Sequence, residues 1–296
     1  MGRLIRCITS CGAVMATCVD TTDIVGKAEQ YHKTSAVVTA ALGRTLTAVS
    51  MIGNMLKGKD NTVTLKITGD GPIGSIVAAS DYEGNVRGYV TNPIVELPLN
   101  NVGKLDVGGA VGKGILYVMK DLGLKEPYIG QIPLTTGEIA EDITAYYAVS
   151  EQTPTVCALG VMVNPDLNVK CAGGFIIQML PNATDAEITK LEKSLEGLES
   201  VTTMLSKNMS PEDILRKALK EFEVEVLYEQ EIEYKCKCSK ERTKNVLSCV
   251  GDDDLKEMIE QEKETNVVCH FCNKEYIFTP AEIRQILDEK KNKKTL

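Results

Sequence analysis

Four cysteines near the C-terminal end of the 296-residue chain are spaced as metal ligands. Cys236 and Cys238 are separated by one residue, Cys269 and Cys272 by two, and a longer insert divides the two pairs. A tetrahedral Zn²⁺ ion binds four thiolates supplied as two close pairs of this kind. The pattern therefore predicts one Zn²⁺ per chain in a closed four-thiolate site. His270, inside the second pair, is not expected to bind because four sulfurs complete the coordination shell.

The same four residues could also do redox chemistry, because the thiolate is the oxidisable form of cysteine. Oxidising both close pairs would remove all four zinc ligands together. Zinc binding contributes roughly 10–16 kcal/mol to folding in small zinc domains. The whole stability of a typical domain is only about 5–15 kcal/mol. Oxidation is therefore expected to unfold the segment around the site and to loosen what precedes it.

The other six cysteines are interpreted as buried small apolar side chains, and no role is assigned to them. They are Cys7, Cys11, Cys18, Cys157, Cys171 and Cys249. For Cys249, which falls between the two pairs, a back-up redox thiol is the alternative. Uneven cysteine spacing without secretory features indicates metal or redox chemistry and favours a cytoplasmic protein. The apolar run 35–56 carries a central Arg44, which favours a buried helix over a membrane span.

Several function classes are disfavoured by composition and motifs. The net charge of −8 argues against a nucleic-acid or anionic-membrane partner. The chain has only two histidines, His32 and His270, so a His-dependent hydrolase is not expected. The glycine-rich run 108–114 lacks the first glycine and the Ser or Thr of a phosphate loop, and it predicts a hairpin instead. No enzyme signature is found.

The cysteine pairs need a C-terminal zone, 231–296, to position them. It has 13 basic and 14 acidic residues and few core residues, so it needs a staple such as a metal. Alternating apolar residues over 221–238 predict a strand that places Cys236 and Cys238 on one face. Helices are expected over 240–250, over 253–262 and from the capping box at Thr279 and Glu282 onward.

Residues 1–180 predict the N-terminal α/β domain of an α+β chain, with a mostly antiparallel sheet, because short β-rich runs are separated by turn residues. Helices are expected over 33–56 and 137–147. Strands are expected over 64–68, 75–80, 86–90, 115–119, 156–163 and 174–180.

Residues 181–230 predict a helical linker. One helix begins at the capping box of Thr184 and Glu187, and another begins at Ser210 with Pro211 at its first position. Both carry an apolar stripe that must pack on something. Exposing those stripes on demand would create a surface for apolar client proteins.

Nearly the whole chain closely resembles the redox-regulated heat-shock holdase chaperones, the zinc-containing thirty-three-kilodalton chaperonin family. The matching N-terminal motifs are Leu42-Gly43-Arg44-Thr45-Leu46-Thr47-Ala48, Gly69-Asp70-Gly71-Pro72-Ile73-Gly74, Val86-Arg87-Gly88-Tyr89-Val90 and Gly103-Lys104-Leu105-Asp106-Val107-Gly108. The central motifs are Lys120-Asp121-Leu122-Gly123-Leu124-Lys125-Glu126-Pro127-Tyr128, Gly137-Glu138-Ile139-Ala140-Glu141-Asp142 and Ala172-Gly173-Gly174-Phe175. The C-terminal motifs are Cys236-Lys237-Cys238-Ser239 and Cys269-His270-Phe271-Cys272-Asn273.

The resemblance implies an N-terminal α/β domain, a helical linker and a small C-terminal zinc domain. It implies an ATP-independent holdase that is inactive while reduced and zinc-bound. Oxidation would form Cys236–Cys238 and Cys269–Cys272 disulfides, release zinc and unfold the zinc domain and linker. The exposed surface would hold unfolding client proteins, and the oxidised form would be a homodimer.

Two other classes of protein are alternatives to the chaperone, a thiol–disulfide oxidoreductase and a zinc-ribbon nucleic-acid binder. A thiol–disulfide oxidoreductase using Cys269 and Cys272 would need an exposed low-pKa thiol on a strand-to-helix turn. A zinc-ribbon nucleic-acid binder would need a basic surface, which the near-neutral zone 231–296 does not predict.

Overall fold

The computed structural model describes residues 1–294, with side chains described through residue 291. The chain divides into two compact units, Met1–Lys235 and Cys236–Leu296. We call them unit 1 and unit 2.

Unit 1 contains two five-stranded antiparallel sheets. Sheet A has the order β10-β1-β2-β9-β8, and its strands are β1 (Gly2–Thr9), β2 (Val14–Asp20), β8 (Thr155–Val163), β9 (Val169–Met179) and β10 (Val224–Ile232). Sheet B has the order β5-β4-β3-β6-β7, and its strands are β3 (Thr62–Gly69), β4 (Ser75–Asp81), β5 (Val86–Val90), β6 (Gly114–Asp121) and β7 (Tyr128–Pro133). The expected α+β class with antiparallel sheets is confirmed.

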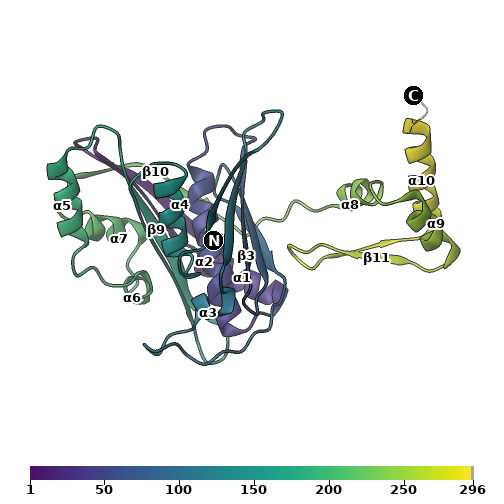
Figure 1. Ribbon diagram of the computed structural model, residues 1–296, viewed down its shortest axis with the longest axis horizontal. Helices are drawn as coiled ribbons and strands as arrows, with labels where there is room; N and C mark the ends of the chain where they lie inside the picture. The colour runs from purple at the N-terminus through teal and green to yellow at the C-terminus, as the bar shows by residue number, and fades with distance from the viewer. Residues whose placement is uncertain (295–296) are drawn as a thin grey trace. The chain divides into compact units, whose positions relative to one another are not determined.

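Helices separate and cover these sheets, so that unit 1 has four layers (Figure 1). The helices between the sheets are α1 (Thr22–His32), α2 (Ala36–Asn54), α3 (Val107–Val111) and α4 (Ala140–Val149). The helices on the other face of sheet A are α5 (Asp185–Leu195), α6 (Val201–Ser206) and α7 (Pro211–Ala218). The main core lies around α2, and a second apolar cluster lies between sheet A and α5–α7.

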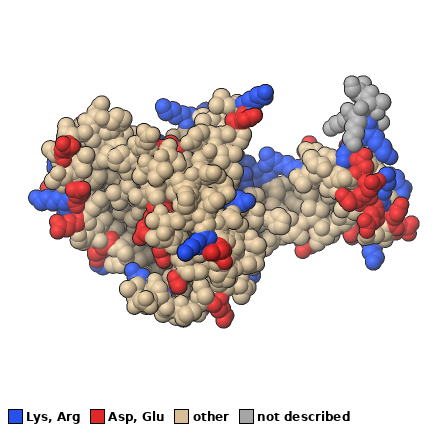
Figure 2. All heavy atoms as spheres, in the orientation of Figure 1, with Lys and Arg blue, Asp and Glu red and all other residues tan. Residues whose placement is uncertain are grey.

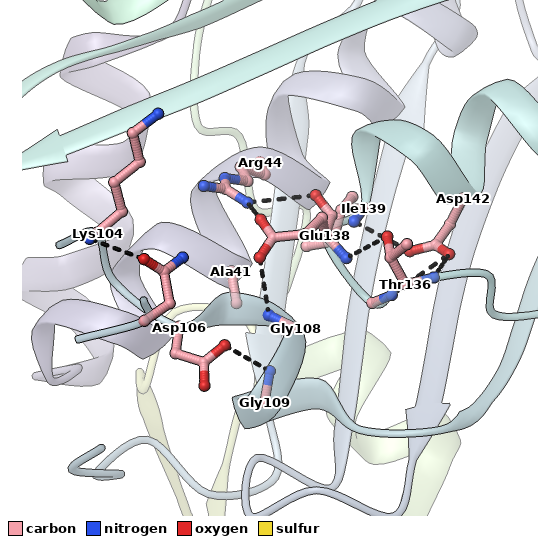
Figure 3. A network of polar contacts seen from close by, with 12 residues as sticks. Ala41, Arg44, Lys104, Asp106, Gly108, Gly109, Thr136, Glu138, Ile139 and Asp142 are labelled. Carbon is pink, nitrogen blue, oxygen red and sulfur yellow. Dashed lines mark hydrogen bonds and ion pairs between the residues drawn. The ribbon is translucent and has the colours of Figure 1, made fainter. Parts of the chain in front are cut away.

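The central helix α2 is the only described helix whose length and composition would allow it to cross a membrane, and 89% of its apolar window is buried inside the fold. It is therefore the core helix of unit 1, as the sequence predicted. Its Arg44 reaches the corner where α3 and α4 begin (Figure 3). There the guanidinium contacts the Glu138 carboxylate, whose other oxygen accepts a hydrogen bond from the Gly108 N–H at 3.3 Å.

The same corner is held by Asp142, which is completely buried. Its carboxylate accepts hydrogen bonds from the N–H groups of Thr135 at 2.7 Å, Thr136 at 3.2 Å and Ile139 at 3.0 Å (Figure 3). Ile139 has a positive φ of 68°, which is unusual for a β-branched residue and is held in place by this carboxylate. The motif 137–142 therefore serves the fold.

Unit 2 is small. It contains α8 (Lys240–Leu247), α9 (Asp252–Glu260), a hairpin of β11 (Thr265–Val268) and β12 (Glu275–Phe278), and α10 (Pro280–Lys294). The predicted capping box starts α10, because the Thr279 N–H donates to Glu282 at 2.8 Å and the Glu282 N–H donates to Thr279 at 3.3 Å.

Two local predictions were wrong. Residues 108–114 do not form a hairpin: the Asp106 side chain accepts a hydrogen bond from Gly109 at the start of the short helix α3, and Gly112, with φ of 73°, ends it. The strand expected through Cys238 ends earlier, because β10 stops at Ile232 and only an isolated bridge at Tyr234 follows.

Residues 181–230 are half helical and also include most of β10, which pairs with β1 at the edge of sheet A. They belong to unit 1 in this conformation. That they act as a linker able to detach stays a prediction.

Candidate metal centre

The first cysteine pair lies on an extended segment without regular secondary structure. Cys236 and Cys238 follow the Tyr234 bridge and precede α8. Ser239 caps that helix, since its hydroxyl accepts a hydrogen bond from the Arg242 N–H at 3.1 Å. The cap fixes where the segment ends and therefore where Cys238 lies.

The second pair lies in the turn of the β11–β12 hairpin. The Asn273 N–H donates to the Cys269 carbonyl at 2.8 Å, and the Cys269 N–H donates to the Lys274 carbonyl at 2.9 Å. Asn273 has a positive φ of 54°, a conformation that Asn tolerates better than most residues. This tight turn brings the sulfurs of Cys269 and Cys272 to one side.

The structure brings the four predicted ligands together. Their Sγ atoms all lie within 4.8 Å of one another. The Cys236–Cys269 sulfur distance is 3.7 Å and the Cys238–Cys272 distance is 3.4 Å. In a tetrahedral site with Zn–S bonds of about 2.3 Å, neighbouring sulfurs are about 3.8 Å apart. The donor set and its spacing therefore fit Zn²⁺, and His270 is outside this group of close-lying donors.

A hydrogen-bond donor supports the cluster. The hydroxyl of Tyr276, on β12, donates to the Cys238 Sγ at 3.1 Å. Desolvation opposes ionisation of Cys238, but hydrogen bonds from Tyr276 and from neighbouring thiols outweigh it and lower the pKa of Cys238 to about 7. Burial and neighbouring sulfurs instead raise the pKa values of Cys236 and Cys272. Without a metal, Cys238 therefore ionises more readily than Cys236 and Cys272.

Tyr276 was not among the residues predicted for the site. It lies in the apolar run of β12, and its ring is part of the unit 2 core. An aromatic residue in such a run has the pattern of a core residue, so nothing in the sequence pointed to its hydroxyl.

The apolar core of unit 2 is small. Its buried members are Leu247, Leu255, Tyr276, Phe278, Ile283, Ile286 and Leu287, and Cys238 and Cys269 pack against it. A core of this size rarely holds a domain without a staple. We therefore expect the fold of unit 2 to depend on a metal ion held by the four sulfurs.

The remaining cysteines do not all match the expectation of burial. Cys7, Cys18 and Cys171 are buried, and Cys157 is half-buried against the main core. The prediction was wrong for two residues, which are exposed: Cys11 lies in the turn between β1 and β2, and Cys249 lies beyond the end of α8.

Neither alternative function gains support. Cys269 and Cys272 lie in a hairpin turn, whereas a thiol–disulfide oxidoreductase carries its pair on a strand-to-helix turn. On the face shown in Figure 2, acidic and basic side chains are interspersed and form no broad basic patch of the kind that binds nucleic acid.

Comparison with known proteins agrees with this architecture. The family model described as Hsp33 protein matches residues 2–279. The 33 kDa chaperonin of Lachnoclostridium phytofermentans is 49% identical, with 96% of this chain and 97% of the relative covered. The 33 kDa chaperonin of Clostridioides difficile is 48% identical, with 97% and 98% covered.

A solved structure shows the same fold. The crystal structure of the 33 kDa chaperonin (heat shock protein 33 homolog) from Thermotoga maritima superposes with a TM-score of 0.89 at 38% identity, covering 98% of this chain and 99% of that one. With a family match over almost its full length and relatives near half identity, the chain belongs to the Hsp33 family of chaperones.

Proposed function

We propose that this protein is a cytoplasmic, ATP-independent holdase that oxidation activates, with Cys236, Cys238, Cys269 and Cys272 as both the Zn²⁺ ligands and the oxidation switch. The observation that carries the proposal is the four sulfurs within 4.8 Å of one another in a unit with a small core. The names of the relatives support the chaperone activity, and the chemistry of the site supports its regulation.

In the reduced state the four thiolates would hold one Zn²⁺ and staple unit 2. An oxidant such as peroxide would take two electrons from each cysteine pair, forming one S–S bond per pair and reducing one peroxide to two waters. Each disulfide removes two ligands, so the second leaves no thiolate to hold the metal. Loss of the zinc contribution, roughly 10–16 kcal/mol in small zinc domains, exceeds what the small core of unit 2 can replace.

The disulfides are proposed to join sequence neighbours, Cys236 to Cys238 and Cys269 to Cys272. In the folded cluster all four sulfurs are close, so proximity alone would also permit crossed pairs. Once the staple is lost and unit 2 opens, closing a short loop costs less entropy than closing a long one. Short-range pairing is therefore favoured in the opened state, and peptide mapping of the oxidised chain tests it.

Unfolding of unit 2 would then free residues 181–230. The second apolar cluster beneath α5–α7 contains fully buried Ile214, Leu215 and Leu219 on the α7 side. Detachment of these helices would expose their apolar stripes and the face of sheet A they cover. Surfaces of this kind bind unfolding client proteins and would also allow the oxidised form to dimerise.

Light scattering of a heat-labile client tests the proposal. Protein pretreated with peroxide at raised temperature should suppress client aggregation without ATP, and the reduced zinc-bound protein should not. Protection by the reduced form and none by the oxidised form would contradict the direction of the switch. Sedimentation of both forms tests dimerisation in parallel.

A further inference from the structure

Three cysteines outside the metal cluster lie on one face of sheet A. Cys7 is on β1, Cys18 on β2 and Cys171 on β9, and these strands are neighbours in the sheet. All three side chains belong to the apolar cluster between sheet A and α5–α7, with exposed fractions of 0%, 0% and 4%. Cys7 and Cys18 lie close together, whereas Cys171 lies four residues along β9 from Phe175, the partner of Cys18. We call these three covered thiols the thiol patch.

The cover over this patch is made by two helices. Helix α7 packs on β1 and β2, above Cys7 and Cys18, and α6 packs on β8 and β9, above Cys171. The Cys171 thiol lies 3.5 Å from the carbonyl oxygen of Thr202 in α6. While the helices are docked, burial raises the pKa of Cys7 to about 11 and also raises the pKa values of Cys18 and Cys171. The covered thiols are thus both inaccessible and un-ionised.

Cys157 provides a contrast within the same sheet. It lies on β8, pairs with Ile176, and packs against the main core on the other face of sheet A. Helices α2 and α4 contact β8 on that side. Detachment of α5–α7 would therefore leave the exposure of half-buried Cys157 unchanged.

We propose that Cys7, Cys18 and Cys171 form a gated modification site. Helices α5–α7 cover this site in the resting protein, and modification of its thiols by an oxidant prevents the helices from docking again. This inference rests on the proposed function, which supplies the event that detaches the helices. It adds a second set of thiols that would prolong the active state after the metal cluster has been reduced.

The chemistry follows from the spacing of the thiols. Cys7 pairs with Ala16, so Cys18 is its diagonal neighbour on the adjacent strand, at a Cα separation of about 7–8 Å. That separation is too long for a disulfide without backbone movement. An uncovered thiolate would instead attack peroxide: the S–O bond forms as the O–O bond breaks, giving a sulfenic acid and hydroxide. A small thiol could then condense with the sulfenic acid, giving a mixed disulfide and water.

Either product would block redocking. The sulfurs pack among apolar side chains of the helices, including Met204, Leu215 and Ala218. Protein interiors are close-packed, so there is no room for an added oxygen or a second thiol compound. A polar group without a partner would also be buried there. Reduction of the modified sulfur would restore the fit.

Residue-resolved alkylation tests the gating. Reduced and peroxide-activated full-length chains would be pulsed with N-ethylmaleimide and mapped by mass spectrometry. In the reduced protein Cys11 should react and the three patch thiols should not. After brief activation, Cys7, Cys18 and Cys171 should react at rates comparable to Cys11 or be found oxidised, while the reactivity of half-buried Cys157 stays as it is in the reduced protein. If the helices lose hydrogen-exchange protection yet the patch thiols are neither alkylated nor oxidised, the inference is wrong.

A variant separates this inference from the proposed function. Ile214→Asp, at a fully buried position in α7, should detach α7 in the reduced zinc-bound protein and open Cys7 and Cys18 without oxidant. Ile188→Asp, at a position that is 39% exposed in α5, is the matched control and should leave them closed. If Cys7 and Cys18 become reactive in Ile214→Asp but not in the oxidised wild type, the proposed oxidation switch is refuted and the gated site still stands. An increase in the reactivity of Cys157 together with that of the patch would show general unfolding and overturn the gate.

The block on redocking has its own test. Activated protein would be alkylated while open, then reduced and supplied with Zn²⁺. The wild type should keep binding client and keep fast hydrogen exchange over α5–α7. The triple variant Cys7→Ala, Cys18→Ala, Cys171→Ala, treated identically, should recover protection and lose client binding, because only the other thiols carry the label. Equal recovery by both chains would overturn the proposal.

Discussion

Replacing Tyr276 with Phe removes the hydroxyl that donates to the Cys238 Sγ at 3.1 Å and leaves the ring in the unit 2 core. A hydrogen bond to a charged group contributes about 1.5–3 kcal/mol, and sulfur is a weak acceptor, so we take the lower end. A loss of about 1.5 kcal/mol weakens zinc binding roughly tenfold. This tenfold loss agrees with the loss of about 10–100-fold in metal affinity that usually follows replacement of a residue hydrogen-bonded to a metal ligand.

The assay is competition for Zn²⁺ with a chromophoric chelator at pH 7.5, using the full-length reduced chain. Tyr276→Phe should bind Zn²⁺ roughly tenfold more weakly and lose it faster when peroxide is added. The matched control is Tyr82→Phe in unit 1, which removes a hydroxyl that contacts Glu83 at 3.1 Å. If both variants bind zinc as tightly as the wild type, the hydroxyl does not support the cluster and the reasoning fails.

Three further predictions concern pH, the fold and the exposed thiol. The pKa values of Cys236 and Cys272 are raised above their ordinary value, so each thiol is protonated at pH 7 and must lose its proton to bind Zn²⁺. Zinc affinity should therefore fall by at least about two orders of magnitude for each unit that the pH drops from 8 to 6, and more steeply below pH 7, where Cys238 with its pKa of about 7 also takes up a proton. A chelator titration showing little pH dependence would contradict this. Asp142→Ala leaves the N–H groups of Thr135, Thr136 and buried Ile139 without their acceptor and should lower the free energy of unfolding of unit 1 by about 3 kcal/mol. Urea unfolding measures it, and Asp166→Ala on an exposed turn should cost under about 1 kcal/mol. Cys249→Ser changes an exposed thiol outside the cluster and should leave zinc content and peroxide activation at wild-type levels, whereas zinc loss by this variant would make Cys249 part of the site.

Several parts of the fold that the sequence predicted well have one face toward solvent. Strands β3, β5 and β6 in sheet B and helices α5 and α7 alternate between buried and more exposed residues, so their periodicity is visible. The strands β1 and β2 were missed because sheet A has helices on both faces, and residues of both parities are buried. A strand buried on both faces loses the alternation that identifies it.

The four ligands of the metal site could be predicted from the sequence, but the residues that contact them could not. Two close pairs of cysteines specify a zinc-type site from spacing alone, and the structure gathers the four sulfurs. The exposure of Cys249 was not predictable, because it depends on α8 ending at Leu247 and not three residues later. The Tyr276 contact and the thiol patch beneath α5–α7 depend on tertiary packing between distant segments, which local patterns do not carry.

Zinc release and thiol oxidation, followed together during peroxide treatment at raised temperature, test the central claim most directly. One Zn²⁺ should leave each chain in step with the loss of four thiols, which peptide mapping should assign to Cys236, Cys238, Cys269 and Cys272. Client protection should appear with the same time course. Zinc that stays bound while client protection appears, or oxidation of those four thiols without zinc release, would contradict it.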